Sequence, residues 1–221
     1  MPLITIIGAG PGLGLEIART FGRKGFDVAL VARDQTKLDA LAQTLADEGV
    51  HARGFTADVS QPETVVSALR SIKDELGPID VLEFSPADPT LTPVDVLKVT
   101  MENLQPQIDF YLGGALSAVG AVLPDMIAAG TGTVLITTGG GSINPTAFLG
   151  NVNIAAAGLR NWALNLHDAL RDHGVYVAHV GIRALIGGGH PDAEPSVIAT
   201  AYGALYDERQ EAELHYVAYD G

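Results

Sequence analysis

The residues best suited to chemistry near the start of this chain are the glycines of Gly8-Ala9-Gly10-Pro11-Gly12-Leu13-Gly14. Glycines let a backbone turn sharply and approach a phosphate, and a helix start offers free N–H groups and partial positive charge. The segment lies between a predicted strand, Leu3–Ile7, and a predicted helix over residues 12–24, the context that this motif requires. A merely tight turn is the alternative. We expect a dinucleotide pyrophosphate to be bound by Gly8, Gly10, Pro11, Gly12, Leu13 and Gly14.

Two basic residues follow the second predicted strand, Asp27–Ala32. NAD-specific sites usually have an acidic residue here that binds the ribose 2′-hydroxyl. Arg33 instead offers a charged, forked group suited to a 2′-phosphate, and Lys37 adds a second charge one turn into the next helix. These residues predict NADP(H) as the cofactor. The alternative is that Arg33 is a solvated loop residue paired with Asp34.

Hydroxyl groups gather around the glycines 139–141, at the end of a predicted strand over residues 133–138. Thr137, Thr138 and Ser142 are candidates for binding substrate or cofactor, and we assign Thr137 to the cofactor. An equally good alternative is that these hydroxyls satisfy the backbone of a glycine-rich turn. Asn151 and Asn153 begin a predicted helix, where capping is the favoured interpretation and catalysis the alternative.

Four other side chains have two interpretations each. His190, in a glycine-rich loop, is a proton donor or a solvated histidine. Arg183 binds an anionic substrate or the phosphate of the cofactor. Glu83 ends a buried strand, so it has a raised pKa or is exposed at the strand tip. His167 and His173 do not have the spacing of a metal site, and we expect no metal.

The elements that position these residues alternate between strand-like and helix-like segments. The pattern predicts one domain over residues 1–221, a doubly wound parallel sheet with helices on both faces. Ser60 and Glu63 have the spacing of a capping box at the start of the third helix. The predicted strands are Leu3–Ile7, Asp27–Ala32, Ala52–Thr56, 79–84, 133–138, 175–181 and Glu213–Ala218. The predicted helices are 12–24, 35–46, 60–76, 100–129, 151–172 and Pro195–Glu208.

The whole chain resembles the short-chain dehydrogenase/reductase family. The resemblance implies a single-domain Rossmann fold with strand order 3-2-1-4-5-6-7. It also implies adenine contacts from Asp58 and Val59 and a cofactor contact from Ser85. The segments that carry it are the glycines 8–14, Ala57-Asp58-Val59, Gly77-Pro78-Ile79-Asp80-Val81-Leu82, Leu123-Pro124-Asp125-Met126 and Tyr219-Asp220-Gly221.

The chain departs from this family where the family does its chemistry. The family's reductases use Ser, Tyr and Lys as a proton relay, helped by an Asn, and the matching positions here are Gly139, Val152, Ala156 and Phe110. The family's Asn-Asn-Ala-Gly is replaced by Phe84-Ser85-Pro86-Ala87, and its Pro-Gly after the sixth strand by Ile182-Arg183.

A slip of one residue in this match does not restore the relay. It places Thr138, Asn151 and Ala155 at the three positions, again without Tyr or Lys. The sequence has no Tyr between Tyr111 and Tyr176, and no Lys after Lys98. The catalytic residues therefore stay unassigned, and Tyr111, His190 and water are the candidate proton donors.

The charge of the chain bears on its partners. The net charge is −13, and no basic stripe is available to neutralise a nucleic-acid backbone or to approach an anionic membrane. There are no cysteines, so zinc thiolate sites and a Cys nucleophile are excluded. Because the start has no basic segment and no apolar run reaches the length of a membrane span, we expect a cytoplasmic protein.

Two functions are consistent with these residues. The first is an NADP(H)-dependent oxidoreductase with a non-standard proton donor, acting on a small-molecule substrate. The second is an NADP(H)-binding sensor or catalytically silent partner, which uses the fold for binding only. The apolar stretch over residues 110–123, rich in small residues, predicts a helix with one face on the sheet and the other against a second subunit. Because members of the family typically pair through two long helices, the resemblance implies a two-fold symmetric homodimer or a homotetramer.

Overall fold

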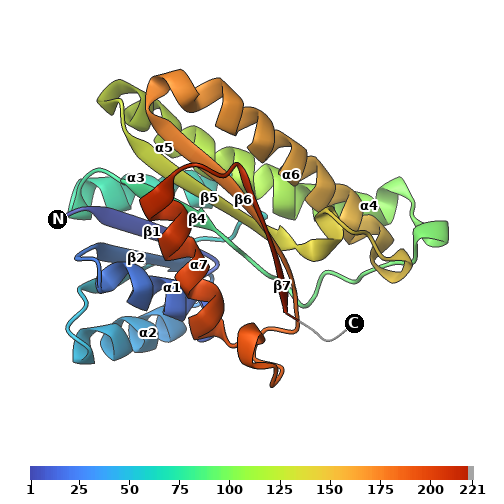
Figure 1. Cartoon of the computed structure of the whole chain (residues 1–221), viewed down its shortest axis with the longest axis horizontal. Helices are drawn as coiled ribbons and strands as arrows, with labels where there is room; N and C mark the ends of the chain where they lie inside the picture. The colour runs from blue at the N-terminus through green and yellow to red at the C-terminus, as the bar shows by residue number, and fades with distance from the viewer. Residues whose placement is uncertain (219–221) are drawn as a thin grey trace.

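The computed structural model describes residues 1–218 as one seven-stranded sheet between two layers of helices (Figure 1). All neighbouring strands are parallel, in the order β3-β2-β1-β4-β5-β6-β7. The predicted α/β Rossmann fold and strand order are therefore confirmed. The segment Tyr219-Asp220-Gly221 lies outside the described residues. The strands are β1 (Leu3–Ile7), β2 (Asp27–Ala32), β3 (Ala52–Thr56), β4 (Val81–Phe84), β5 (Gly132–Gly139), β6 (Val175–Ala184) and β7 (Glu213–Ala218).

Helices cover both faces of the sheet, and this explains the continuous apolar runs in its strands. Every residue of β1 is buried, as is typical of parallel strands that pack on helices on either side. One face packs against α1 (Leu13–Gly22), α2 (Gln35–Asp47) and α7 (Pro195–Glu208). The other face packs against α3 (Pro62–Leu76), α5 (Gly114–Ala129) and α6 (Gly150–Leu170), which lie together in Figure 1.

Two predicted helix caps are wrong. α3 begins after Gln61 without a side-chain cap, because Pro62 is suited to the first helical position. Ser60 instead lies in the preceding turn, where its backbone N–H donates to Asp58. α6 begins at Gly150, so Asn151 lies inside the first turn and uses its side chain elsewhere.

α4 (Met101–Ile108) and α5 form one helical column, joined by a π-helical turn over Asp109–Gly113. By length and composition Met101–Ala129 is apolar enough to cross a membrane, although one third of its most apolar window is buried inside the fold (33%). The expectation that no apolar run reaches this length was therefore wrong. In the fold, α5 packs on α3 and on the sheet, while Leu116 and Ile127 are exposed.

Candidate functional site

A cleft of about 740 Å³ opens at the carboxyl end of β1, between the ends of β2 and β4. At this point the chain leaves β1 for β2 on one side and later returns to β4 on the other. In open α/β sheets, ligands bind where the strand order reverses in this way. The cleft is lined by Ile7, Gly8, Ala9, Gly10, Pro11, Leu15, Val31, Ala32, Arg33, Asp34, Lys37, Ala40, Leu41, Thr44, Ala57, Val59, Pro86, Ala87 and Phe110.

Gly8 shows why the floor of this cleft needs glycine. Its φ is +100°, a conformation that residues with a side chain rarely adopt. A Cβ on Gly8 would lie 2.5 Å from the Cα of Pro86. The backbone after β1 and the backbone after β4 are therefore too close here for a side chain to fit between them. At Gly10, by contrast, an added Cβ meets no atom within 4 Å, which leaves the backbone accessible from the cleft.

The predicted cofactor residues divide into two groups. Gly8, Gly10, Pro11, Arg33, Lys37 and Val59 line the cleft. Gly12, Leu13, Gly14, Asp58, Ser85 and Thr137 do not, and their cofactor contacts stay predictions. Gly12 precedes α1 and Leu13 begins it, so this part of the motif shapes the helix start. The apolar walls from Leu41, Ala57 and Phe110 were not predicted, because each comes from a different element.

Arg33 forms an ion pair across the mouth of the cleft. Its Nη1 lies 2.7 Å from Oδ2 of Asp88, in the segment after β4. The predicted alternative partner, Asp34, instead caps α2 by accepting from the backbone N–H of Lys37, and its carboxylate lies 3.6 Å from Lys37 Nζ. Hydrogen bonds from Thr90, together with the charge of Arg33, lower the pKa of Asp88. Arg33 and Lys37 place two positively charged side chains at the rim of the cleft, next to the end of β2.

Glu83 is fully buried, so exposure at the strand tip is ruled out. Ser85 Oγ donates to its Oε2 at 2.8 Å, and Thr137 Oγ1 donates to its Oε1 at 3.0 Å. Thr137 is also hydrogen-bonded to the hydroxyl of Tyr202, at 2.8 Å. Burial raises the pKa of Glu83 to about 8, partly offset by the bonds from Ser85 and Thr137. Burial therefore favours the protonated form of this carboxyl group.

A second polar chain runs beneath α6 and was not predicted from the sequence. His179, in β6, is fully buried, and its Nε2 lies 2.8 Å from Thr138 Oγ1. Its Nδ1 lies 3.0 Å from Oε1 of Glu213, in β7. Thr138 Oγ1 is also 2.8 Å from Ser142 Oγ. The signal in the sequence was a histidine inside an otherwise apolar strand.

Arg160, in α6, binds the carboxylate of Glu213 at the end of this series of polar contacts. Arg160 binds Glu213 through both carboxylate oxygens, with Nε 2.5 Å from Oε1 and Nη2 2.7 Å from Oε2. The hydrogen bond from Arg160 is the largest cause that lowers the pKa of Glu213. Burial lowers the pKa of His179, although Glu213 opposes this effect. Arg160 lies one turn after Ala156 on the same helix, so both share a face.

The other candidates have mainly structural contacts. Asn151 Nδ2 donates to the carbonyls of Thr92 and Asn103, and its Oδ1 accepts from Val94 N–H, so it fastens the segment after β4 to α6. Asn153 donates to the carbonyl of Thr146. Neither side chain therefore caps a helix.

Two of the proposed proton donors are poorly suited to that role. Tyr111 is largely buried, and burial, helped by the charge of Asp88, raises its pKa. The family's Tyr needs the opposite shift. His190 Nδ1 accepts from the backbone N–H of Asp192 and so caps a short turn. Phe110 lies in the π-helical turn, and such turns are frequent at functional sites.

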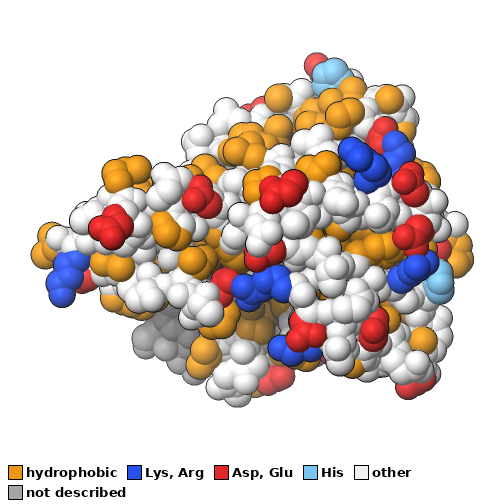
Figure 2. Space-filling view, turned by 180° about the vertical axis from the view of Figure 1, so that it is seen from behind, with side chains coloured by type: hydrophobic (Ala, Val, Ile, Leu, Met, Phe, Trp, Pro, Cys, Tyr) orange, Lys and Arg blue, Asp and Glu red, His pale blue; other side chains and the backbone are white. Residues whose placement is uncertain are grey.

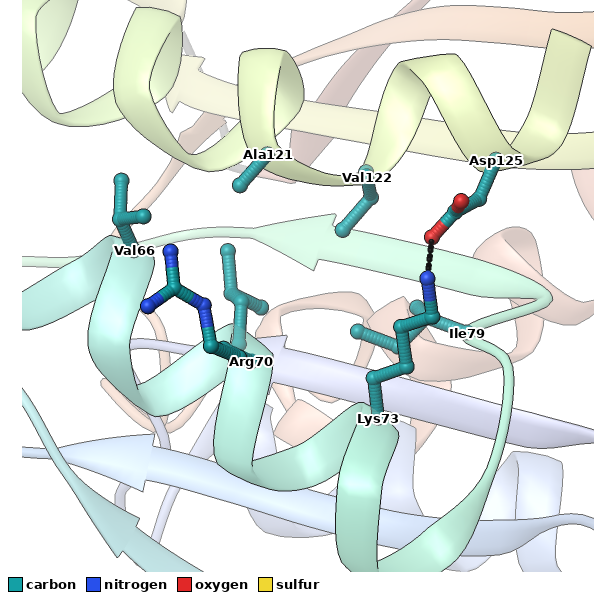
Figure 3. A pocket seen from close by; sticks show the side chains of 8 residues that line it. Val66, Arg70, Lys73, Ile79, Ala121, Val122 and Asp125 are labelled. Atoms are coloured by element: carbon teal, nitrogen blue, oxygen red, sulfur yellow. Dashed lines mark hydrogen bonds and ion pairs between the residues drawn. The ribbon is translucent and has the colours of Figure 1, made fainter.

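A separate hollow lies between α3 and α5, away from the cleft (Figure 3). Val66, Ile79 and Val122 give it apolar walls, and the ion pair of Lys73 with Asp125 closes one side at 2.6 Å. On the face shown in Figure 2, Lys and Arg side chains lie among acidic ones instead of forming one basic patch. Within residues 1–218, no group of three or more His, Asp or Glu side chains is arranged to hold a metal.

Comparison with known proteins agrees with this geometry. Residues 2–184 match the short chain dehydrogenase family. A very-long-chain 3-oxoacyl-CoA reductase of Neurospora crassa is 29% identical over 185 residues, covering 82% of this chain and 55% of the relative. The corresponding protein of Pyricularia oryzae is 30% identical over 187 residues, with the same coverage. The chain thus spans about half the length of these curated relatives.

Solved structures share the fold across nearly the whole chain. L-sorbose reductase from Gluconobacter frateurii, complexed with NADPH and L-sorbose, superposes with a TM-score of 0.86 at 20% identity, covering 98% of this chain and 94% of that one. A metagenomic short-chain oxidoreductase in complex with NADP gives a TM-score of 0.84 at 24% identity, covering 100% and 98%. With the strand order, the glycine turn and the family match over residues 2–184 in agreement, this chain belongs to the short-chain dehydrogenase family.

Proposed function

We propose that this protein is an NADP(H)-dependent oxidoreductase whose active site lacks the Tyr and Lys of its family. The observation that carries the proposal is the cleft at the end of β1, with Gly8 and Gly10 on its floor and Arg33 and Lys37 at its rim. The residues fit the cofactor, because bare backbone at a helix start suits a pyrophosphate and Arg33 suits a 2′-phosphate. The relatives solved with NADPH or NADP support the same cofactor.

When bound, NADPH supplies a hydride to an electrophilic carbon. The chain's own part is to hold the cofactor against the carboxyl ends of β4 and β5 and to provide a proton for the oxygen of a carbonyl substrate. A substrate that already carries positive charge, such as an iminium, needs no such proton. The named relatives reduce 3-oxoacyl thioesters of coenzyme A, so this class belongs among the first carbonyl substrates offered.

A second candidate is an NADP(H)-binding sensor. It is favoured by the residues at the family's catalytic positions, since Gly139, Val152 and Ala156 have no ionisable side chain. Both functions predict tight binding of NADPH, but only the first predicts turnover.

The deciding experiment is a calorimetric titration with NADPH and NADH, followed by a screen of aldehydes, ketones, imines and 3-oxoacyl-CoA thioesters. Loss of reduced-cofactor absorbance establishes the oxidoreductase. Tight binding without turnover favours the sensor, and no binding of either cofactor contradicts both.

A further inference from the structure

We propose that Ser142, Thr138 and His179, anchored by Glu213 and Arg160, form a proton-transfer chain that replaces the Tyr and Lys of the family. The proposal rests on the oxidoreductase function, and it names the residues that supply the proton. Ser142 is the end of the chain that delivers a proton to the substrate oxygen. Thr138 and His179 act through Ser142 and are positioning residues.

The polar contacts are continuous from Ser142 to Arg160. Ser142, Thr138 and His179 are linked by two separations of 2.8 Å, and His179 reaches Glu213 at 3.0 Å. Every separation is within hydrogen-bond range, so a proton crosses the chain without any large movement of a side chain. Glu213 in turn is bound through both oxygens to Arg160, which fixes the carboxylate.

Thr138 lies at the carboxyl end of β5, one residue before Gly139, and Ser142 lies in the turn that follows. The two registers of the family match place the family's Ser at Gly139 or at Thr138, and Ser142 follows Thr138 by one short turn. The chain therefore begins at the carboxyl edge of the sheet, the edge at which the cofactor cleft opens.

Burying His179 is costly at a position where packing alone needs only an apolar side chain. It has no exposed surface, and a buried imidazole needs a partner for each ring nitrogen. An ionised Glu213 accepts from Nδ1–H, which orients the ring and directs Nε2 at Thr138. An apolar residue would fill the same place in β6 without needing a hydroxyl, a carboxylate and a guanidinium around it.

Bound NADPH would supply the hydride, so a C–H bond of its nicotinamide would break as a C–H bond forms at the carbonyl carbon, and the π electrons of the carbonyl would move to oxygen. That oxygen takes the proton of Ser142 Oγ, Ser142 takes the proton of Thr138 Oγ1, and Thr138 takes the Nε2 proton of the His179 imidazolium. The products would be an alcohol, the oxidised cofactor and a neutral imidazole. After the alcohol leaves, the imidazolium forms again by taking up one proton from the bulk solvent along the same hydroxyls, so each turnover consumes one solvent proton.

The proposed proton-transfer chain predicts a characteristic pH dependence of kcat. The groups that face His179 are Glu213 and His215 from β7 and Arg160 from α6. Burial lowers the pKa of His179, so the imidazolium forms only below the ordinary range for histidine. We therefore expect kcat for carbonyl reduction to rise as the pH falls through that pKa. We expect kcat for alcohol oxidation to rise as the pH increases through it.

The test compares four variants with the wild type, using acetoacetyl-CoA and the best carbonyl substrate of the screen. Thr138→Val removes the hydroxyl that links Ser142 to His179 and keeps a side chain of similar shape. Thr138→Ser keeps a hydroxyl at this position. His179→Gln keeps a polar side chain that does not titrate. His167→Gln is the control, because His167 is a partly buried histidine whose Nδ1 is hydrogen-bonded to the carbonyl of Val177, outside the proton-transfer chain. Circular dichroism confirms that each variant folds.

We expect Thr138→Val to lower kcat by about 10²-fold or more, the usual size of a general-acid effect. KM and the Kd for NADPH should change by less than about 3-fold. Thr138→Ser should recover most of the rate, and His179→Gln should flatten the pH profile. His167→Gln should change neither the rate nor the profile.

A second readout does not depend on catalysis. NMR titration of the His179 ring in the cofactor-free protein should give a pKa below the ordinary value. Thr138→Val should lower that pKa further, because the imidazolium loses an acceptor for its Nε2 proton. His167→Gln should leave the pKa of His179 unchanged.

The possible failures are distinguishable. Unchanged kcat in both Thr138→Val and His179→Gln, with a working wild type, overturns the proton chain and leaves the oxidoreductase intact. A wild type that binds NADPH but turns over no substrate overturns both proposals and favours the sensor. If His179→Gln does not fold, the pair of Thr138 variants still decides the question.

Discussion

The guanidinium of Arg33 and the carboxylate of Asp88 are ion-paired across the mouth of the cofactor cleft, with Nη1 2.7 Å from Oδ2. Arg33 comes from the end of β2 and Asp88 from the segment after β4, so the pair joins the two sides of the cleft. A 2′-phosphate that binds Arg33 must compete with this carboxylate. Asp88 therefore reduces the preference for NADPH that Arg33 creates.

This relationship gives the first prediction. Asp88→Asn should raise the affinity ratio of NADPH to NADH by about 1.5- to 5-fold, since a partly exposed ion pair is worth roughly 0.2–1 kcal/mol. Arg33→Asp should reverse the preference, because a charge-assisted hydrogen bond is worth roughly 1.5–3 kcal/mol, or about 10- to 150-fold. Calorimetry with both cofactors measures the ratio. Asp125→Asn, on the distant ion pair with Lys73, is the control and should have no effect.

The second prediction separates two glycines of one motif. Gly8→Ala should lower the free energy of unfolding by roughly 1–3 kcal/mol, because its φ is +100° and its Cβ would meet Pro86. Gly10→Ala should change stability by less than about 0.5 kcal/mol, since nothing lies within 4 Å of its Cβ. Its methyl group enters the cleft, so NADPH affinity should fall by about 10-fold. Urea unfolding and calorimetry test the pair, and equal behaviour of the two variants would contradict this interpretation.

The third prediction concerns Glu83 and pH. The folded protein raises the pKa of this carboxyl to about 8, whereas an unfolded chain leaves it near about 4.3. Between these values the folded state holds one more proton, so the free energy of unfolding falls as the pH rises and levels off above about pH 8. Glu83→Gln cannot ionise and should lose this slope, which amounts to at most about 1.4 kcal/mol per pH unit. Urea unfolding from about pH 5 to pH 8 checks it; parallel curves for the two proteins would refute it.

The fourth prediction is a symmetric dimer. The outer face of α5 exposes Leu116 and Ile127, at 49% and 36% of their surface, on a helix whose other face is buried in the core. Light scattering at micromolar concentration should therefore give a multiple of the 23.0 kDa chain mass.

Leu116→Glu should weaken that assembly by at least about 10-fold, because burying a leucine is worth roughly 1.5–3 kcal/mol. Leu185→Glu, also exposed but on the segment after β6, is the control and should leave the mass unchanged. A wild-type monomer would overturn the prediction.

The amino-acid sequence alone determined the fold. The strands Leu3–Ile7, Asp27–Ala32, Ala52–Thr56 and Glu213–Ala218 have the predicted bounds. The first two are apolar runs that turn residues interrupt within a few positions. Gly8 and Gly10 line the cleft because the glycine turn is built from residues that are neighbours along the chain, and Arg33 lines it because it follows the second strand. Their contacts with the cofactor stay predictions.

Tertiary structure decided which distant side chains meet. Asp88, and not the neighbouring Asp34, binds Arg33, because β4 pairs directly with β1 and brings the segment after it to the cleft. His179 reaches Thr138 across the pairing of β6 with β5, and it lies opposite Glu213 in the pairing with β7. Local periodicity reports which face of an element is buried. It does not report which polar groups from other elements share that face, because strand order and register set those contacts across tens of residues.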